Sequence, residues 1–167
     1  MDLRAFLKKE GEQPLDRIVQ NGGFCGIFRK IVCVGDSLSS GEMEGMMDGK
    51  RIYHDMYEYS WGQFMARDIG AEVYNCSRGG MTAKAYVESF ADERGFWDEK
   101  YSAQGYIIAL GVNDMARVVE GEMEYGSLAD VHVDAPEENP HTFVGSYAAI
   151  LSRYQKMVPK TLPLHIT

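Results

Sequence analysis

The sequence predicts an α/β fold with a parallel sheet, because three short apolar runs alternate with helical patterns. The runs cover residues 31–34, 71–76 and 106–110, and each is followed directly by glycine or serine. Mostly apolar runs of this length are typical of strands that are buried on both faces. Strands separated by helices favour parallel pairing through right-handed crossovers.

The helical patterns between these runs carry recognisable ends. Ser60 and Gln63 have capping-box spacing, Gly70 supplies a stop, and the apolar positions between them repeat at helical spacing. A second helix is predicted to start near Thr82 and to run through Tyr86. A third follows Pro140, and we interpret its aromatic residues as core rather than as a cofactor site. Its apolar positions at helical spacing are Phe143, Tyr147, Ile150, Leu151, Tyr154 and Val158.

The 167 residues suit one domain with a short extension, and 45% of them are hydrophobic. We predict a helical extension over residues 1–23 and an α/β domain over residues 24–167. Residues 118–138 contain seven acidic residues and no lysine or arginine, which indicates an exposed loop rather than a cation site. Residues 161–167 contain a proline and form at most an edge strand.

Charge and cysteine content exclude several classes of protein. Lys and Arg number 17 against 25 Asp and Glu, a net charge of −8, which disfavours nucleic acid and anionic membranes as partners. We find no apolar run long enough to span a bilayer, and the charges in residues 1–10 do not fit a signal peptide. The 3 cysteines lack metal-ligand spacing. We therefore expect free thiols, no metal or other cofactor, and a cytoplasmic protein.

Polar and glycine-rich segments follow all three predicted strands. They are Gly-Asp-Ser-Leu at 35–38, an Asn75 followed five residues later by Gly80, and Gly-Val-Asn-Asp at 111–114. Each segment alone could be a helix cap or a turn. Parallel strands end at one edge of their sheet, where ligands bind in open α/β folds. The three together therefore predict a functional site at that edge.

This ordered set of motifs resembles the SGNH/GDSL family of serine esterases and acylhydrolases, over residues 31–113 and the helix that follows. The resemblance implies a three-layer, flavodoxin-like fold and an ester hydrolase acting on a small-molecule ester, such as a lipid-like acyl ester or an acetylated carbohydrate. It implies that Ser37 is the nucleophile. It also implies an oxyanion hole built from the backbone N–H groups of Ser37 and Gly80 and the side chain of Asn113.

The sequence departs from that family at its last motif, Asp-x-x-His, which supplies the general base. No aspartate in the chain has a histidine three residues later. We therefore expect a fold that is incomplete on its C-terminal side, with very low esterase activity and an open sheet edge that favours self-association. The histidines present are His54, His132, His141 and His165, and His54 is the nearest substitute along the chain after Ser37.

Two further functions stay open from the sequence. The chain can be an inactive binding or assembly module that keeps the fold, or a mononucleotide binder in which residues 37–41 hold a phosphate. Asp36 and Glu42 would repel that phosphate. Aromatic and methionine side chains after the first motif either wall an acyl or sugar pocket or pack in the core: Met43, Met46, Met47, Tyr53, Tyr57, Tyr59 and Trp61.

Overall fold

The computed structural model describes residues 23–159 of the chain. Its centre is a parallel sheet of three strands in the order β4-β1-β5, made by β1 (Lys30–Gly35), β4 (Glu72–Asn75) and β5 (Gly105–Ala109). The predicted strands and their parallel pairing are therefore confirmed. The predictions for residues 1–22 and 161–167 fall outside the described range.

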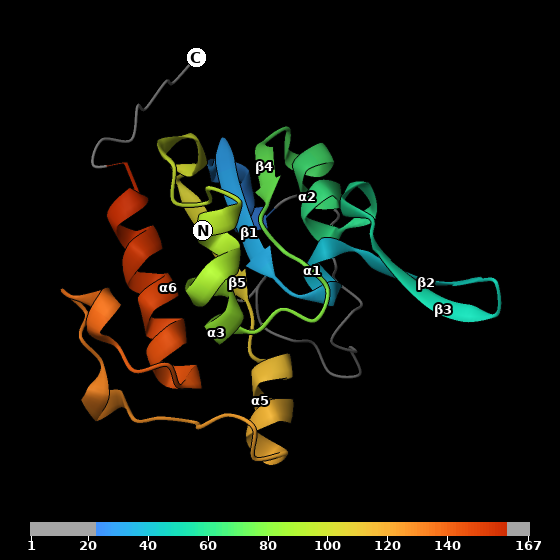
Figure 1. Ribbon diagram of the computed structural model, residues 1–167. Coiled ribbons are helices and arrows are strands. Elements are labelled where there is room, and N and C mark those ends of the chain that lie inside the picture. The colour runs from blue at the N-terminus through green and yellow to red at the C-terminus, as the bar shows by residue number, and fades with distance from the viewer. Residues whose placement is uncertain (1–22, 160–167) are drawn as a thin grey trace, which may run out of the picture.

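Helices cover both faces of this sheet, which makes a three-layer α/β arrangement (Figure 1). Val32 and Val34 of β1 belong to a core beneath α3 (Ala83–Ala85), α4 (Ala91–Glu93) and α6 (Phe143–Met157). Ile31 and Cys33 belong to a second core beneath α2 (Trp61–Ile69). Side chains of a strand alternate between its two faces, so a single run of apolar residues supplies both cores.

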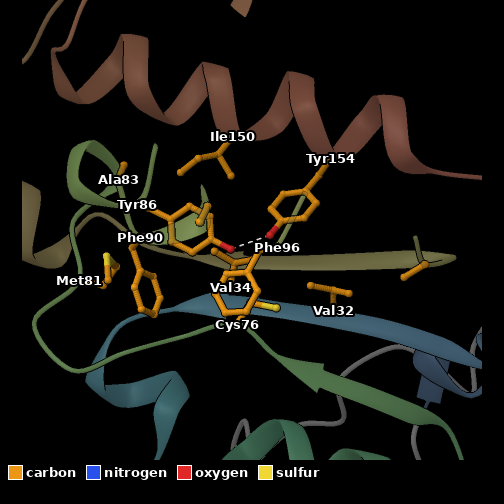
Figure 2. Close-up of a cluster of buried hydrophobic side chains, with 12 residues drawn as sticks. Val32, Val34, Cys76, Met81, Ala83, Tyr86, Phe90, Phe96, Ile150 and Tyr154 are labelled. Atoms are coloured by element: carbon orange, nitrogen blue, oxygen red, sulfur yellow. Dashed lines mark hydrogen bonds between the residues drawn. The ribbon is translucent and has the colours of Figure 1, made fainter. Parts of the chain in front are cut away.

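The larger core is rich in aromatic rings, and two of its tyrosines share a buried hydrogen bond. The hydroxyl oxygens of Tyr86 and Tyr154 lie 2.6 Å apart, and Figure 2 shows them meeting between α6 and the sheet. Tyr86 belongs to a π-helical turn, Tyr86–Phe90, that joins α3 to α4. Each hydroxyl satisfies the other, so two large side chains are buried without an unpaired polar group.

The caps of α2 agree with the sequence in part. Ser60 Oγ accepts a hydrogen bond from the backbone N–H of Gln63, and Gly70 ends the helix at a φ of 64°. The second half of the predicted capping box is wrong. The Gln63 side chain donates to the carbonyl of Val73 in β4 at 3.1 Å, because the neighbouring strand offers an acceptor.

The helix predicted after Pro140 is α6. Its aromatic residues Phe143, Tyr147 and Tyr154 pack in the larger core, so the core interpretation is confirmed for them. Leu151 is 48% exposed, and Val158, which follows the helix, is 39% exposed. The acidic segment begins within α5 (Val112–Val119) and continues through two 3-10 turns, Leu128–Asp130 and Pro136–Glu138, with most of its side chains exposed as expected.

A β-hairpin that the sequence reading missed projects from this body (Figure 1). It follows the short helix α1 (Ser37–Ser40) and consists of β2 (Glu42–Met47) and β3 (Lys50–Asp55) in antiparallel pairing. Asp48 and Gly49 form its two-residue turn, with φ angles of 51° and 74°. Positive φ at both positions is the conformation for which an Asp-Gly pair is preferred, and this pair was the missed signal. Other 3-10 turns cover Gly23–Ile27, Tyr57–Tyr59 and Glu99–Tyr101.

Candidate active site

The first motif forms the turn between β1 and α1. Asp36 is 2% exposed and caps the helix, its Oδ1 accepting a hydrogen bond from Leu38 N–H at 3.0 Å. Ser37 is the first residue of α1 and is only partly buried. A Cβ on Gly35 would lie 2.2 Å from Ser39 Oγ, so only glycine lets α1 fold back this closely over the end of β1.

The second motif is held against the first by its asparagine. Asn75 Nδ2 donates to the carbonyl of Ser39 at 2.7 Å and to Ser60 Oγ at 3.1 Å, while Asn75 Oδ1 accepts from Ser77 N–H. The backbone N–H of Arg78 donates to the carbonyl of Gly35 at 3.2 Å. This network fixes the loop of residues 77–81, which we call the glycine loop, beside the carboxyl end of β1.

Gly80 lies in the glycine loop with a φ of 70° and is exposed. No atom lies within 4 Å of the position that a Cβ would occupy there. The site needs glycine at this residue for its backbone conformation rather than for space. Within residues 23–159, the backbone N–H groups of Ser37 and Gly80 have no hydrogen-bond partner, so both donors are available to a bound molecule.

The third motif reaches the same edge through α5. Asn113 Nδ2 donates to the carbonyl of Met81 at 3.0 Å and lies 3.5 Å from Asp36 Oδ2. Asn113 therefore lies on the side of the sheet where Ser37 and the glycine loop lie. The structure brings together the three residues that the sequence singled out, Ser37, Gly80 and Asn113.

Asp114, the last residue of the third motif, joins two helix starts. Its carboxylate is fully buried and accepts from the N–H of Ala83, at 2.9 and 3.0 Å for its two oxygens. Burial raises the pKa of this carboxyl, and the backbone N–H groups that face it oppose that rise. Asp114 thus fixes α5, which carries Asn113, against the start of α3, which follows the glycine loop.

The base of the hairpin adds two carboxylates that the sequence reading did not select. Asp55 Oδ1 accepts from Ser40 Oγ at 2.5 Å and from Gly79 N–H at 2.9 Å. Glu42 extends its carboxylate against Gly79, where a Cβ would collide with it. The hairpin is therefore bound both to α1 and to the glycine loop. Met43, Met46, Met47 and Tyr53 are more than half exposed, so the core-packing explanation is wrong for them.

No described histidine lies in hydrogen-bond contact with Ser37 Oγ. His141 Nδ1 pairs with Glu88 Oε1 at 2.5 Å, and His132 is exposed with its backbone bonded to Asn139. His54 is exposed on β3, opposite Met43. His165 lies outside the described residues. The structure therefore does not assign a general base among residues 23–159.

Two cysteines next to this edge, Cys33 and Cys76, do not offer an alternative nucleophile. Cys33 and Cys76 are free and fully buried, and burial raises the pKa of the Cys33 thiol to about 12 and that of Cys76 further still. Among residues 23–159, no group of three His, Cys, Asp or Glu side chains could hold a metal ion. Within the same range, no helix has the length and apolar character that crossing a bilayer requires.

Comparison with protein families assigns the chain to a family of lipases and acylhydrolases. The model of the GDSL-like lipase/acylhydrolase family matches residues 31–165. The chain belongs to this family, a family of ester hydrolases, and its parallel sheet flanked by helices is the fold expected for it. Comparison with curated proteins and with solved structures found no match.

Proposed function

We propose that the chain is a serine hydrolase of small acyl esters in which Ser37 is the nucleophile. One observation carries the proposal: a partly exposed serine lies beside two unpaired backbone N–H groups and one asparagine amide, all at one sheet edge. An acetyl group on a carbohydrate and a short acyl chain on another alcohol are both within this substrate class.

The proposed reaction has two balanced halves. Ser37 Oγ bonds to the ester carbonyl carbon and gives its proton to a general base, and the alcohol departs with a proton as the carbon–oxygen bond breaks. Water then attacks the acyl-serine, releasing the carboxylic acid and restoring the hydroxyl. Both halves pass through a tetrahedral oxyanion, which the N–H groups of Ser37 and Gly80 stabilise.

Asn113 is the third proposed donor to that oxyanion. Its amide has two N–H bonds, of which one serves the carbonyl of Met81. The other faces Asp36 Oδ2 at 3.5 Å, a distance too long for a strong hydrogen bond. That second N–H is the group we expect to turn toward the oxyanion. Each such donor contributes about 3–4 kcal/mol to stabilisation of the transition state.

Active-site labelling tests the proposal. We expect a fluorophosphonate to bond covalently to Ser37 in the full chain, and Ser37→Ala to abolish both labelling and hydrolysis of 4-nitrophenyl acetate. The loss of turnover should reach at least about 10³-fold. Ser127→Ala is the matched control, because Ser127 is exposed and only caps a 3-10 turn far along the chain. Labelling that persists in Ser37→Ala would contradict the assignment.

A second candidate function is a binding or assembly module that keeps the fold without turnover. The observation in its favour is that no basic side chain contacts Ser37 Oγ within the described residues. This alternative predicts that the folded chain is not labelled and hydrolyses the ester no faster than buffer. If turnover is seen, separate His→Ala substitutions at positions 54, 132, 141 and 165 will identify the base, whose removal costs as much as that of Ser37.

A further inference from the structure

Two arginines lie beside the glycine loop without a carboxylate partner. Arg78 belongs to the loop, and Arg94 follows α4. Within residues 23–159, no Asp or Glu oxygen lies within 4.0 Å of either guanidinium.

Both guanidinium groups are held on one aromatic ring. Their central carbons lie 4.6 Å (Arg78) and 5.7 Å (Arg94) from the centroid of Phe90, whose side chain is only 3% exposed. Figure 2 shows Phe90 beside Met81, the residue after Gly80. Stacking on an aromatic ring fixes a guanidinium plane and leaves its N–H edges free for a ligand.

The electrostatics of Tyr57 connect this pair of arginines to the site. Tyr57 donates a hydrogen bond from its hydroxyl to the carbonyl of Ser77 at 3.2 Å, at the start of the glycine loop. Burial and Asp55 raise the pKa of Tyr57, and Arg94 and Arg78 act in the opposite direction. The two guanidinium charges therefore act on a hydroxyl that is bonded to the start of the glycine loop.

Two carboxylates contact the glycine loop, and both come from the base of the hairpin. Asp55 accepts from Ser40 and Gly79, and Glu42 lies against Gly79. Neither is paired with Arg78 or Arg94.

We infer that the ester taken by this site carries an anionic group, a carboxylate or a phosphate, and that Arg78 and Arg94 hold it beside Gly80. The inference rests on the proposed function, because it places the scissile ester at Ser37. Guanidinium groups match both anions with paired N–H donors, and their rigid placement on Phe90 limits the ordering cost of binding. Arg78 and Arg94 thus determine which esters bind, and Ser37 carries out the reaction.

A matched pair of esters tests it. The full chain is assayed with 3-acetoxybenzoate and with its neutral methyl ester, which lacks the charge meta to the acetoxy group, and only release of acetate is measured. We expect kcat/KM to favour the anionic ester, and Arg78→Gln or Arg94→Gln to reduce that preference by about tenfold each. The preference should also fall as salt rises, since exposed charges are screened. A parallel assay with 3-acetoxyphenyl phosphate shows whether phosphate is preferred to carboxylate.

Arg67→Gln is the control for charge and stacking. Arg67 lies on α2, and its guanidinium carbon is 4.7 Å from the ring of Phe64, so it makes the same kind of contact away from the glycine loop. We expect this variant to keep the preference of the unchanged protein. An equal kcat/KM for both esters, or a preference that survives in the double variant Arg78→Gln/Arg94→Gln, would overturn the inference.

A binding measurement separates this inference from the proposed function. If neither ester is turned over, the proposed function fails, and calorimetric titration of the full chain with 3-hydroxybenzoate still tests the arginines. Binding that weakens about tenfold in Arg78→Gln, but not in Arg67→Gln, would support an anion site without hydrolysis. Absence of binding at millimolar 3-hydroxybenzoate, or binding indifferent to both arginines, would refute it.

Discussion

The carboxyl edge of the sheet and the projecting hairpin are neighbours in sequence, yet they are stabilised in different ways. At the sheet edge, Asp36, Asn75 and Asp114 are each hydrogen-bonded to another segment, so every loop is fixed by at least one other. The hairpin beyond Glu42 is held by its own cross-strand pairs and by a surface ion pair between Arg51 and Glu44 at 2.8 Å. Rigidity at the site therefore comes from contacts between distant segments, and a single hairpin lacks them.

The sharpest test of this difference compares two glycine-to-alanine substitutions. Gly35→Ala places a Cβ 2.5 Å from Ser39 Cβ, which is fixed by α1, so we expect a loss of about 2–3 kcal/mol in the free energy of unfolding. Gly45→Ala in β2 meets only Ile52 at 3.5 Å, an ordinary contact. Urea unfolding should show that Gly45→Ala is neutral or slightly stabilising. Equal losses in the free energy of unfolding would show that the sheet edge and the hairpin are equally sensitive to an added methyl group.

Alkaline pH should unfold the body through its tyrosines. Burial raises the pKa of Tyr86 and of Tyr154, so the folded protein keeps both neutral. Their stabilisation is fully present below about pH 10, where unfolded tyrosine is also neutral, and is lost as the pH rises above it. Urea unfolding should show a decline that steepens above pH 10 toward about 1.4 kcal/mol per pH unit for each of these tyrosines. Tyr154→Phe should reduce the slope, and an unchanged slope would contradict the assignment.

Removing one hydroxyl of the Tyr86–Tyr154 pair should lower the free energy of unfolding by more than half of what removing both hydroxyls does. Tyr86→Phe leaves the Tyr154 hydroxyl buried without a partner, so we expect a loss of about 1–2 kcal/mol in the free energy of unfolding. The double variant Tyr86→Phe/Tyr154→Phe should lose less than the sum of the single losses, because neither polar group remains. Additive losses in the thermodynamic cycle would mean that the two hydroxyls do not interact.

Asp55 is the test of how the hairpin is joined to the body. Asp55→Ala removes the acceptor of Ser40 Oγ and of Gly79 N–H, and we expect hydrogen exchange of hairpin amides to rise about tenfold. Amides of β1 should exchange as before, because the sheet pairs do not involve Asp55. Asp68→Ala on the outer surface of α2 is a charge-matched control. Faster exchange in β1 would show that the hairpin stabilises the sheet itself.

The smallest effect is expected at the hairpin tip. Met46 and Met47 are 68% and 60% exposed, so replacing either by serine should change the free energy of unfolding by less than about 0.5 kcal/mol. Thermal unfolding of both variants measures this. A loss of a kilocalorie or more would reveal that the tip packs against another surface in solution.

The sheet and the polar segments at its three strand ends were predictable because strands that are buried on both faces have continuous apolar sequences. Residues 31–34 are apolar since both faces of β1 are covered, and Gly35 must be glycine because Ser39 fills the space above it. The hairpin was missed because its faces carry no such constraint. Only Asp48 and Gly49 mark it, through their positive φ angles.

The partners of the site could not be read from the sequence, because they depend on contacts between distant segments. Asp55 is 15 residues from Ser40 and 24 from Gly79 in the chain, and its spacing to either has no recognisable pattern. The stacking of Arg78 and Arg94 on Phe90 likewise depends on the turn of the chain around α4. Such side chains look like any charged surface residue until the fold places them.

The two buried thiols report on how the helices on each side of the sheet detach from it. Cys33 lies in the core beneath α2, and Cys76 in the core beneath α3 and α6. A neutral, inaccessible thiol cannot react with an alkylating reagent, so each cysteine is modified only while its own side of the sheet is open. Mass spectrometry of the two modification rates therefore times the detachment of each layer separately, without any engineered probe.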